Sequence, residues 1–108
     1  MKHQLMTVMP DALGAAQMHC AAGVWTEVQV IGSLDIEWAL GLLRAGEACL
    51  ELNAEDLDAY EVEVVVVRDD VLVVVANNIG AFILRLERGA NIGIALGFAH
   101  QQVRMQRA

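Results

Sequence analysis

Alternating apolar and polar positions predict strands in the first part of the chain. The segment from Val24 to Ile31 has the two-residue period of a β-strand. One of its faces is expected to carry Val24, Thr26, Val28 and Val30, and the other Trp25, Glu27, Gln29 and Ile31. The preceding segment, Ala15 to Cys20, is less regular, and a helix opened by Pro10 is the alternative. We favour a strand because Gly23 suits the tight turn of a β-hairpin, and because a strand needs a neighbour.

Helical spacing replaces this alternation between Leu34 and Leu52. The charged residues there follow one another at intervals of 7, 3 and 4 positions and so line one narrow stripe of a helix. The stripe consists of Glu37, Arg44, Glu47 and Glu51. Ser33 is the expected N-cap. Apolar residues cover most of the remaining circumference, so the helix is expected to pack against a sheet and also against a second element or a second copy of the chain.

Two valine-rich runs, Glu61–Val67 and Val71–Ala76, are joined by the three residues Arg68-Asp69-Asp70. A connection this short predicts an antiparallel hairpin, and Ala81–Glu87 continues it as a third strand. In the first run, one face is expected to carry Val62, Val64 and Val66, and the other Glu63, Val65 and Val67. Because the valine-rich strands are apolar on both faces, the sheet is expected to be covered on both sides.

The last segment, Asn91 to Gln106, fits two patterns. Its first half alternates large and small residues, as a strand does, but an apolar helical period also extends over its whole length. Gly93 and Gly97 each weaken a helix by about 1 kcal/mol unless something packs closely against them. We favour a helix capped by Asn91, because the pattern is too long for an ordinary strand.

Composition narrows the class of protein. The chain has 108 residues, of which 56% are apolar and 19% charged, so it fits one folded domain and not a disordered chain. The formal net charge of -7 argues against nucleic-acid binding and against docking on an anionic membrane. No apolar run approaches the roughly 20 residues of a membrane-spanning helix, and Pro10 and Asp11 lie where a signal peptide would be apolar. Two cysteines without CxxC spacing fit reduced thiols, so we expect a cytoplasmic protein.

Candidate catalytic groups are few. Cys20 follows His19, but neighbouring residues of a strand point to opposite faces, so His19 is not placed to activate the thiol. His100 precedes Arg104 by one helical turn, and no carboxylate is predicted to orient its ring. The acidic stretch from Glu51 to Glu63 lacks the EF-hand pattern and is expected to be a solvated loop, attracted to the basic carboxyl-terminal end. We expect no enzymatic activity, no cofactor and no metal site.

In this order of elements, the chain resembles the Roadblock (dynein light-chain Roadblock) family of small α/β proteins, which regulate or scaffold Ras-like GTPases. The resemblance rests on GAAQMHCAAGVWTEVQVIGSLD (residues 14–35) and on VVVVRDDVLVVVANNIGAFILRLERGANIGIALGFAHQ (residues 64–101). It implies one α+β domain over residues 1–108, with a profilin-like five-stranded antiparallel sheet in the order hairpin, helix, three-stranded meander, helix. The family usually begins with a further helix, for which residues 1–13 leave at most one turn.

The resemblance also implies a homodimer in which the central helices pair and the strand Glu61–Val67 meets its copy. The interface would include Trp38, Leu42, Leu43, Val62, Val64 and Val66. The charged stripe, presented twice, would bind a small Ras-like GTPase. The alternative is a hot-dog-like or small-ligand-binding dimer with a pocket at the dimer seam, an architecture that pairs strands separated in sequence. The short connection Arg68-Asp69-Asp70 speaks against that arrangement.

Overall fold

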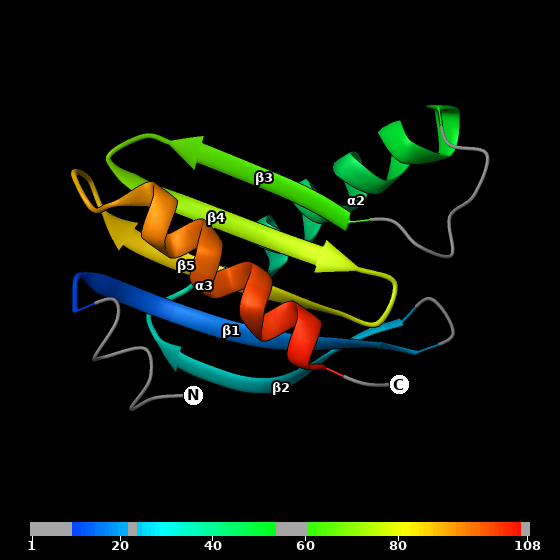
Figure 1. Ribbon diagram of the computed structural model, residues 1–108, viewed down its shortest axis with the longest axis horizontal. Coiled ribbons are helices and arrows are strands. Elements are labelled where there is room, and N and C mark those ends of the chain that lie inside the picture. Colours follow the sequence, from blue (N-terminus) through cyan, green and yellow to red (C-terminus); the bar gives the residue numbers. More distant parts are fainter. Residues whose placement is uncertain (1–9, 22–23, 54–60, 107–108) are drawn as a thin grey trace.

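The predicted order of elements is confirmed by the computed structural model, which describes residues 10–21, 24–53 and 61–106 and only the backbone of residues 46–53 (Figure 1). The elements are β1 (Ala12–Ala21), β2 (Val24–Gly32), α2 (Ile36–Asn53), β3 (Glu61–Val67), β4 (Asp70–Asn77), β5 (Gly80–Glu87) and α3 (Ile92–Met105). The less regular first segment is therefore a strand, and it begins three residues earlier than its pattern indicated. The last segment is a helix.

The five strands form one antiparallel sheet in the order β2-β1-β5-β4-β3. The connection of Arg68 to Asp70 places Val67 opposite Val71, as its length predicted. Strands β3, β4 and β5 follow one another as a meander, and β1 joins this meander along β5. Strands β2 and β3 are consequently the two edges of the sheet.

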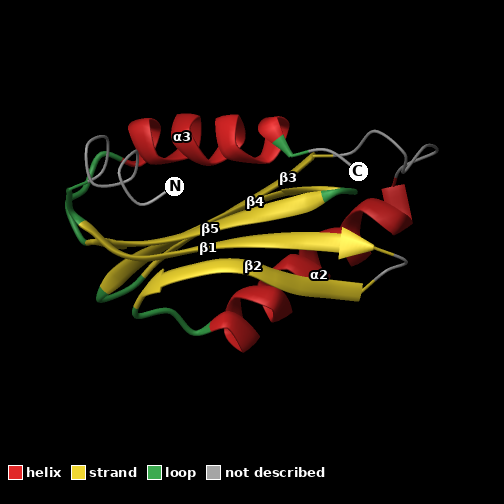
Figure 2. Ribbon diagram, turned by 90° about the horizontal axis from the view of Figure 1, so that it is seen from below, coloured by secondary structure: helices red, strands yellow, loops and turns green. Residues whose placement is uncertain are grey.

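The sheet is covered on both faces, as the valine-rich strands predicted (Figure 2). On one face, α3 contacts β4 and β5; on the other, α2 contacts β3 and β4. Strand β4 divides its side chains between the two layers. Val71, Val73 and Val75 belong to the core beneath α3, and Leu72, Val74 and Ala76 to the core beneath α2. The fold is thus a three-layer α+β arrangement with apolar packing on each side of a central sheet.

The cap of α2 differs from the prediction that Ser33 holds it. Gly32 has a φ of 69°, a left-handed conformation that suits glycine, and the chain turns there. The helix then begins at Ile36, and the Asp35 side chain accepts a hydrogen bond from the Trp38 N–H at 3.0 Å. Asp35 is therefore the capping residue, because the turn delays the helix by two positions. The α3 cap is as predicted, with the Asn91 side chain accepting from the Ile94 N–H at 3.1 Å.

The predicted faces of β2 are wrong for half of the strand. The pairing of β1 with β2 shifts register between Gln17 and Met18, which leaves Val28 as an additional residue in β2. Trp25 packs against the core beneath α2, and Val30 lies opposite Ala16 of that same core. Trp25 and Val30 therefore share a face that strict alternation assigns to different sides. A β-bulge is the physical reason, because one extra residue reverses the alternation beyond it.

Candidate functional site

The β3 edge is a regular strand with an uncovered outer side. All seven of its residues pair with β4 without a register shift, and no strand lies on its other side among the described residues. Val62 is buried, and Val64 and Val66 are half-buried against the α2 layer. Val65 and Val67 point to the α3 face and are 38% and 52% exposed.

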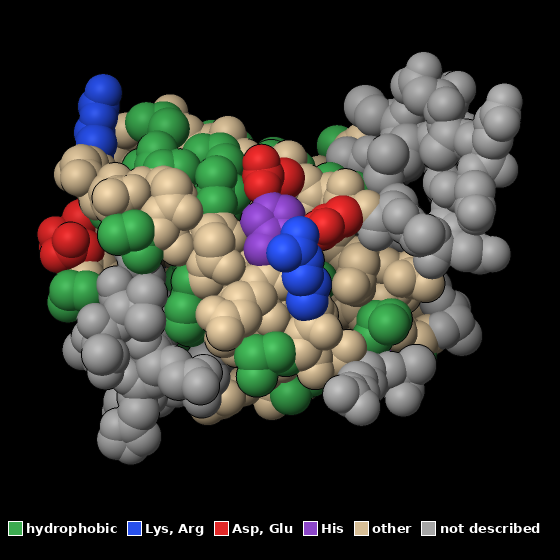
Figure 3. Space-filling view, viewed as in Figure 1, with side chains coloured by type: hydrophobic (Ala, Val, Ile, Leu, Met, Phe, Trp, Pro, Cys, Tyr) green, Lys and Arg blue, Asp and Glu red, His purple; other side chains and the backbone are tan. Residues whose placement is uncertain are grey.

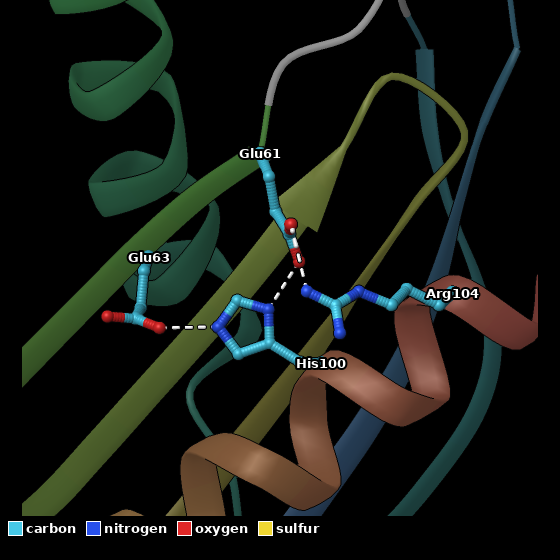
Figure 4. Close-up of polar contacts among 4 residues, drawn as sticks. All are labelled: Glu61, Glu63, His100 and Arg104. Carbon is cyan, nitrogen blue, oxygen red and sulfur yellow. Dashed lines mark hydrogen bonds and ion pairs between the residues drawn. The ribbon is translucent and has the colours of Figure 1, made fainter.

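A cluster of charged side chains joins this edge to α3. The ring of His100 lies between the carboxylates of Glu61 and Glu63, with Nδ1 in contact with Oε1 of Glu61 and Nε2 with Oε1 of Glu63 (Figure 4). Arg104 donates from Nη2 to Oε2 of Glu61 at 3.4 Å. Figure 3 shows a histidine side chain in purple on the molecular surface, flanked by acidic side chains in red and a basic side chain in blue. We refer to these four residues as the His100 cluster.

The spacing of these residues explains why they meet. Glu61 and Glu63 are two positions apart in a strand and so share the face that looks toward α3. His100 and Arg104 are four positions apart in α3 and so lie on the same side of the helix. Helix α3 packs on β4 and β5, and β3 is the next strand beyond β4. The side of the helix that carries His100 and Arg104 therefore reaches the acidic end of β3.

The His100 cluster corrects two sequence-based expectations. No carboxylate was predicted beside His100, yet two contact its ring. Glu61 and Glu63 were counted with a solvated acidic loop as well as with the predicted strand Glu61–Val67, and the structure confirms the strand, since both belong to β3. The attraction between the acidic stretch and the basic carboxyl-terminal end is confirmed within one chain by the ion pair of Arg104 and Glu61. The other acidic residues of that stretch lie outside the described side chains. The sequence pattern that could have indicated this cluster is a pair of acids at strand spacing, Glu61 and Glu63, together with a basic pair at helical spacing, His100 and Arg104.

Two pKa shifts follow from this arrangement. Burial alone would lower the pKa of His100, but the hydrogen bonds and the charges of Glu63 and Glu61 outweigh it and raise that pKa above its ordinary value. Burial would likewise raise the pKa of Glu61. The hydrogen bond and charge of His100, with the charge of Arg104, outweigh it and lower that pKa. The cluster therefore stabilises the ionised forms of both His100 and Glu61.

The His100 cluster links β3 to α3, and its two carboxylates do not converge on a common point. They contact opposite nitrogen atoms of the ring, and no group of three or more His, Cys, Asp or Glu side chains in the described part of the chain is arranged to hold a metal ion. Its chemistry is that of charge-assisted hydrogen bonds between an edge strand and a helix.

A pocket of about 230 Å³ lies where β2 leads into α2. It is lined by Ser33, Leu34, Asp35, Trp38, Asp70, Leu72 and Arg85. Arg85 Nε donates to Asp70 Oδ2 at 2.5 Å, and its Nη1 donates to Ser33 Oγ at 3.2 Å. The guanidinium of Arg68 lies 5.5 Å from the centre of the Trp38 ring. These contacts connect β4, β5 and the turn between β3 and β4 to α2 and to the segment that leads into it.

The predicted interface residues fall into two groups. On α2, Trp38 is exposed and Leu42 half-buried, whereas Leu43 is wholly buried between the helix and the sheet. Leu43 therefore supports the fold of one chain and has no surface to offer a second copy. The three predicted residues of β3 also face the core beneath α2; they are Val62, Val64 and Val66. The surface that the β3 edge leaves open therefore consists of its outer backbone groups and of the exposed side chains of Val65 and Val67.

The predicted charged stripe is described only in its first half. Glu37 and Arg44 are exposed on α2. Glu47 and Glu51 belong to the same helix, but their side chains lie outside the described residues. His19 and Cys20 point to opposite faces of β1, since their partners in β2 are Thr26 and the core residue Trp25. This pairing agrees with the predicted opposite orientation of the two side chains in the strand.

Comparison with models of known protein families, with curated proteins and with solved structures yields no match. Over the described residues, neither helix combines the length and the apolar character that crossing a membrane requires.

Proposed function

We propose that this protein is a non-enzymatic interaction protein that forms a homodimer and binds, scaffolds or regulates a small Ras-like GTPase. The observation that carries the proposal is the β3 edge, a regular strand with no partner on its outer side among the described residues. Such an edge is a template for pairing with another chain. A two-fold dimer covers it with the same edge of a second copy.

The position of α2 supports the same dimer. This helix contacts β3 and β4, so it lies beside the open edge. Pairing of β3 with its copy would therefore bring the two α2 helices close together. Trp38 and Leu42 retain exposed surface for a contact between these helices. Sheet pairing and helix pairing together would remove from water apolar surface that one chain leaves exposed.

The GTPase partner rests on the resemblance to the Roadblock family. A dimer would present the exposed charged residues Glu37 and Arg44 twice, once on each α2. Such a surface can bind one conformation of the partner's switch regions more tightly than another. Binding would then increase the fraction of the GTPase that adopts this conformation. The protein would then act by binding, with no catalytic group of its own.

Light scattering on three proteins tests the dimer. The wild-type chain is expected to be a dimer at micromolar concentration. Changing both exposed valines of the open edge, Val65→Lys with Val67→Lys, is expected to yield a folded monomer, because lysines on an edge strand oppose pairing. The control carries the same chemistry on the other edge, Val24→Lys with Val30→Lys, and is expected to remain a dimer. A compact wild-type monomer would refute the proposed dimer.

Retention of a GTPase tests the partner. The small Ras-like GTPases encoded in the same genome would be passed over the immobilised protein with GDP and with a GTP analogue. One of them is expected to be retained in a nucleotide-dependent manner. Glu37→Lys with Arg44→Glu should reduce its retention while the dimer mass is unchanged, because both side chains are exposed. Retention of none in either nucleotide state would exclude this function.

A further inference from the structure

The side of β3 that faces α3 is attached to the helix at one end only. Val65 and Val67 on that side are exposed, and neither belongs to the core beneath α3. At the other end, Glu61 and Glu63 contact the ring of His100. Beyond the ladder with β4, the His100 cluster is therefore what ties this face of the edge strand to the helix.

The attachment is complete only when the ring of His100 carries a proton on each nitrogen. An imidazolium donates from both nitrogen atoms, whereas the neutral ring donates from one and accepts at the other. Each nitrogen atom of the His100 ring faces a carboxylate oxygen (Figure 4). An ionised carboxylate has no proton to donate, so it can only accept a hydrogen bond from an N–H of the ring. Loss of one proton leaves Glu61 or Glu63 facing a lone pair, and the contact becomes repulsive.

The charges around His100 balance in one protonation state. Glu61 and Glu63 approach from β3, and Arg104 approaches from α3. Strand β4, which lies between, contributes Val73 and Val75 beneath the helix and no titratable side chain there. Two carboxylates, one guanidinium and one imidazolium sum to zero charge. The neutral ring leaves one negative charge on the edge strand of each chain.

We propose that protonation of His100 controls pairing along the β3 edge. With the proton bound, the cluster holds the first half of β3 in the conformation that a second copy can extend, and the edge is electrically neutral. With the proton lost, the contacts of this half of the strand with α3 are weakened while its ladder with β4 remains, and each edge carries a negative charge that opposes its copy. The inference rests on the proposed homodimer and adds its regulation.

The direction in which dimer affinity changes with pH follows from the raised pKa of His100. The contacts of His100 are present at and below the ordinary pKa of histidine and are lost as pH rises through the raised value. We expect the dissociation constant of the wild-type dimer to rise roughly tenfold or more between about pH 6 and about pH 8.5. Sedimentation equilibrium at both pH values would measure it, with circular dichroism to verify that the chain stays folded.

Three variants isolate His100 as the group that titrates. His100→Gln is expected to form a weaker dimer whose dissociation constant changes less than about twofold over the same range, because glutamine does not titrate there. Glu63→Gln changes a surface side chain without disturbing the core, and it is expected to reduce the pH dependence, because one of the two carboxylates that contact the imidazolium is then replaced by a neutral amide. His19→Gln, the control in β1, is expected to retain the full wild-type dependence.

The possible outcomes separate the two proposals. A wild-type dimer of equal affinity at both pH values overturns the control by His100 and leaves the dimer intact. Unchanged pH dependence in His100→Gln overturns it as well, because another group must then titrate. A wild-type monomer at both pH values overturns the proposed homodimer itself, and the regulation with it.

Discussion

The two edges of the sheet differ in regularity more than in hydrophobicity. Strand β2 exposes the larger amount of valine, with Val28 and Val30 at 60% and 41%. Its bulge, however, places Val24 on the face opposite to Val30 and interrupts the row of backbone groups. Strand β3 exposes less, but its register is unbroken, and Val65 and Val67 point to the same side.

The comparison shows that backbone geometry decides which edge is available. A bulge twists and bends an edge strand, and natural sheets use this to prevent unwanted pairing. An edge that is regular over seven residues and contacts a helix on one face can accept another strand. Among the described residues, the β2 edge carries more exposed valine but is interrupted by its bulge, whereas the β3 edge is regular and has no strand on its outer side.

The largest expected effect comes from removing the support beneath the β3 edge. Leu43→Asp places an unpaired charge in the fully buried layer between α2 and the sheet. We expect a loss of about 4 kcal/mol or more in the free energy of unfolding, measured by chemical denaturation. Val30→Asp, at an exposed position on the same face but at the other edge, should cost less than about 1 kcal/mol. Equal stability of the two variants would contradict the burial of Leu43.

Deletion of Val28 should make the two edges alike. Without this residue, the two halves of β2 keep their partners in β1, and the ladder becomes continuous. A regular β2 edge is expected to pair in addition to β3, so that the chain forms assemblies larger than a dimer as its concentration increases. Sedimentation velocity over a range of concentrations would detect them. A variant that sediments like the wild type would show that the bulge does not protect this edge.

The stability of the β3 edge should depend on pH in a defined direction. The raised pKa of His100 contributes stability that is present below the ordinary histidine value and is lost as pH rises through the raised pKa. The lowered pKa of Glu61 contributes stability that is lost as pH falls through it. We expect each loss, the one at high pH and the one at low pH, to lower the free energy of unfolding by about 1 kcal/mol or less, because water screens the charges of these groups. Denaturation across pH would measure it. His100→Gln should abolish the loss at high pH, and an unchanged loss would assign it elsewhere.

The smallest expected effect concerns Arg104. Its side chain is 67% exposed and reaches Glu61 at 3.4 Å. Arg104→Ala is therefore expected to lower the free energy of unfolding by less than about 0.5 kcal/mol. Chemical denaturation at low and high salt would measure it. A loss above 1 kcal/mol that disappears in high salt would show that the whole cluster, and not one surface pair, depends on this charge.

Much of the fold was predictable from local patterns. The two helices, the valine-rich hairpin and the covering of both faces follow from periodicity and from the length of the turns. The N-cap of α2 and the faces of β2 were not predictable in this way. The turn at Gly32 and the bulge at Val28 arise from the pairing of β1 with β2, and pairing registers are not visible in the pattern of a single segment.

The candidate site was predictable only in its parts. Glu61 and Glu63 at strand spacing, and His100 and Arg104 at helical spacing, each formed a recognisable pair. Their meeting depends on the angle at which α3 crosses the sheet, which is set by packing against β4 and β5. About 37 residues of chain separate the two pairs, so no local rule connects them.

The sequence by itself determined which segments are strands and helices, because hydrophobic period and turn residues act over a few neighbouring positions. The tertiary structure decided which strands lie at the edges, which of these edges is regular, and that His100 receives two carboxylates. These properties depend on the order of strands and the placement of helices over them, which are set by the burial of apolar surface across the whole molecule.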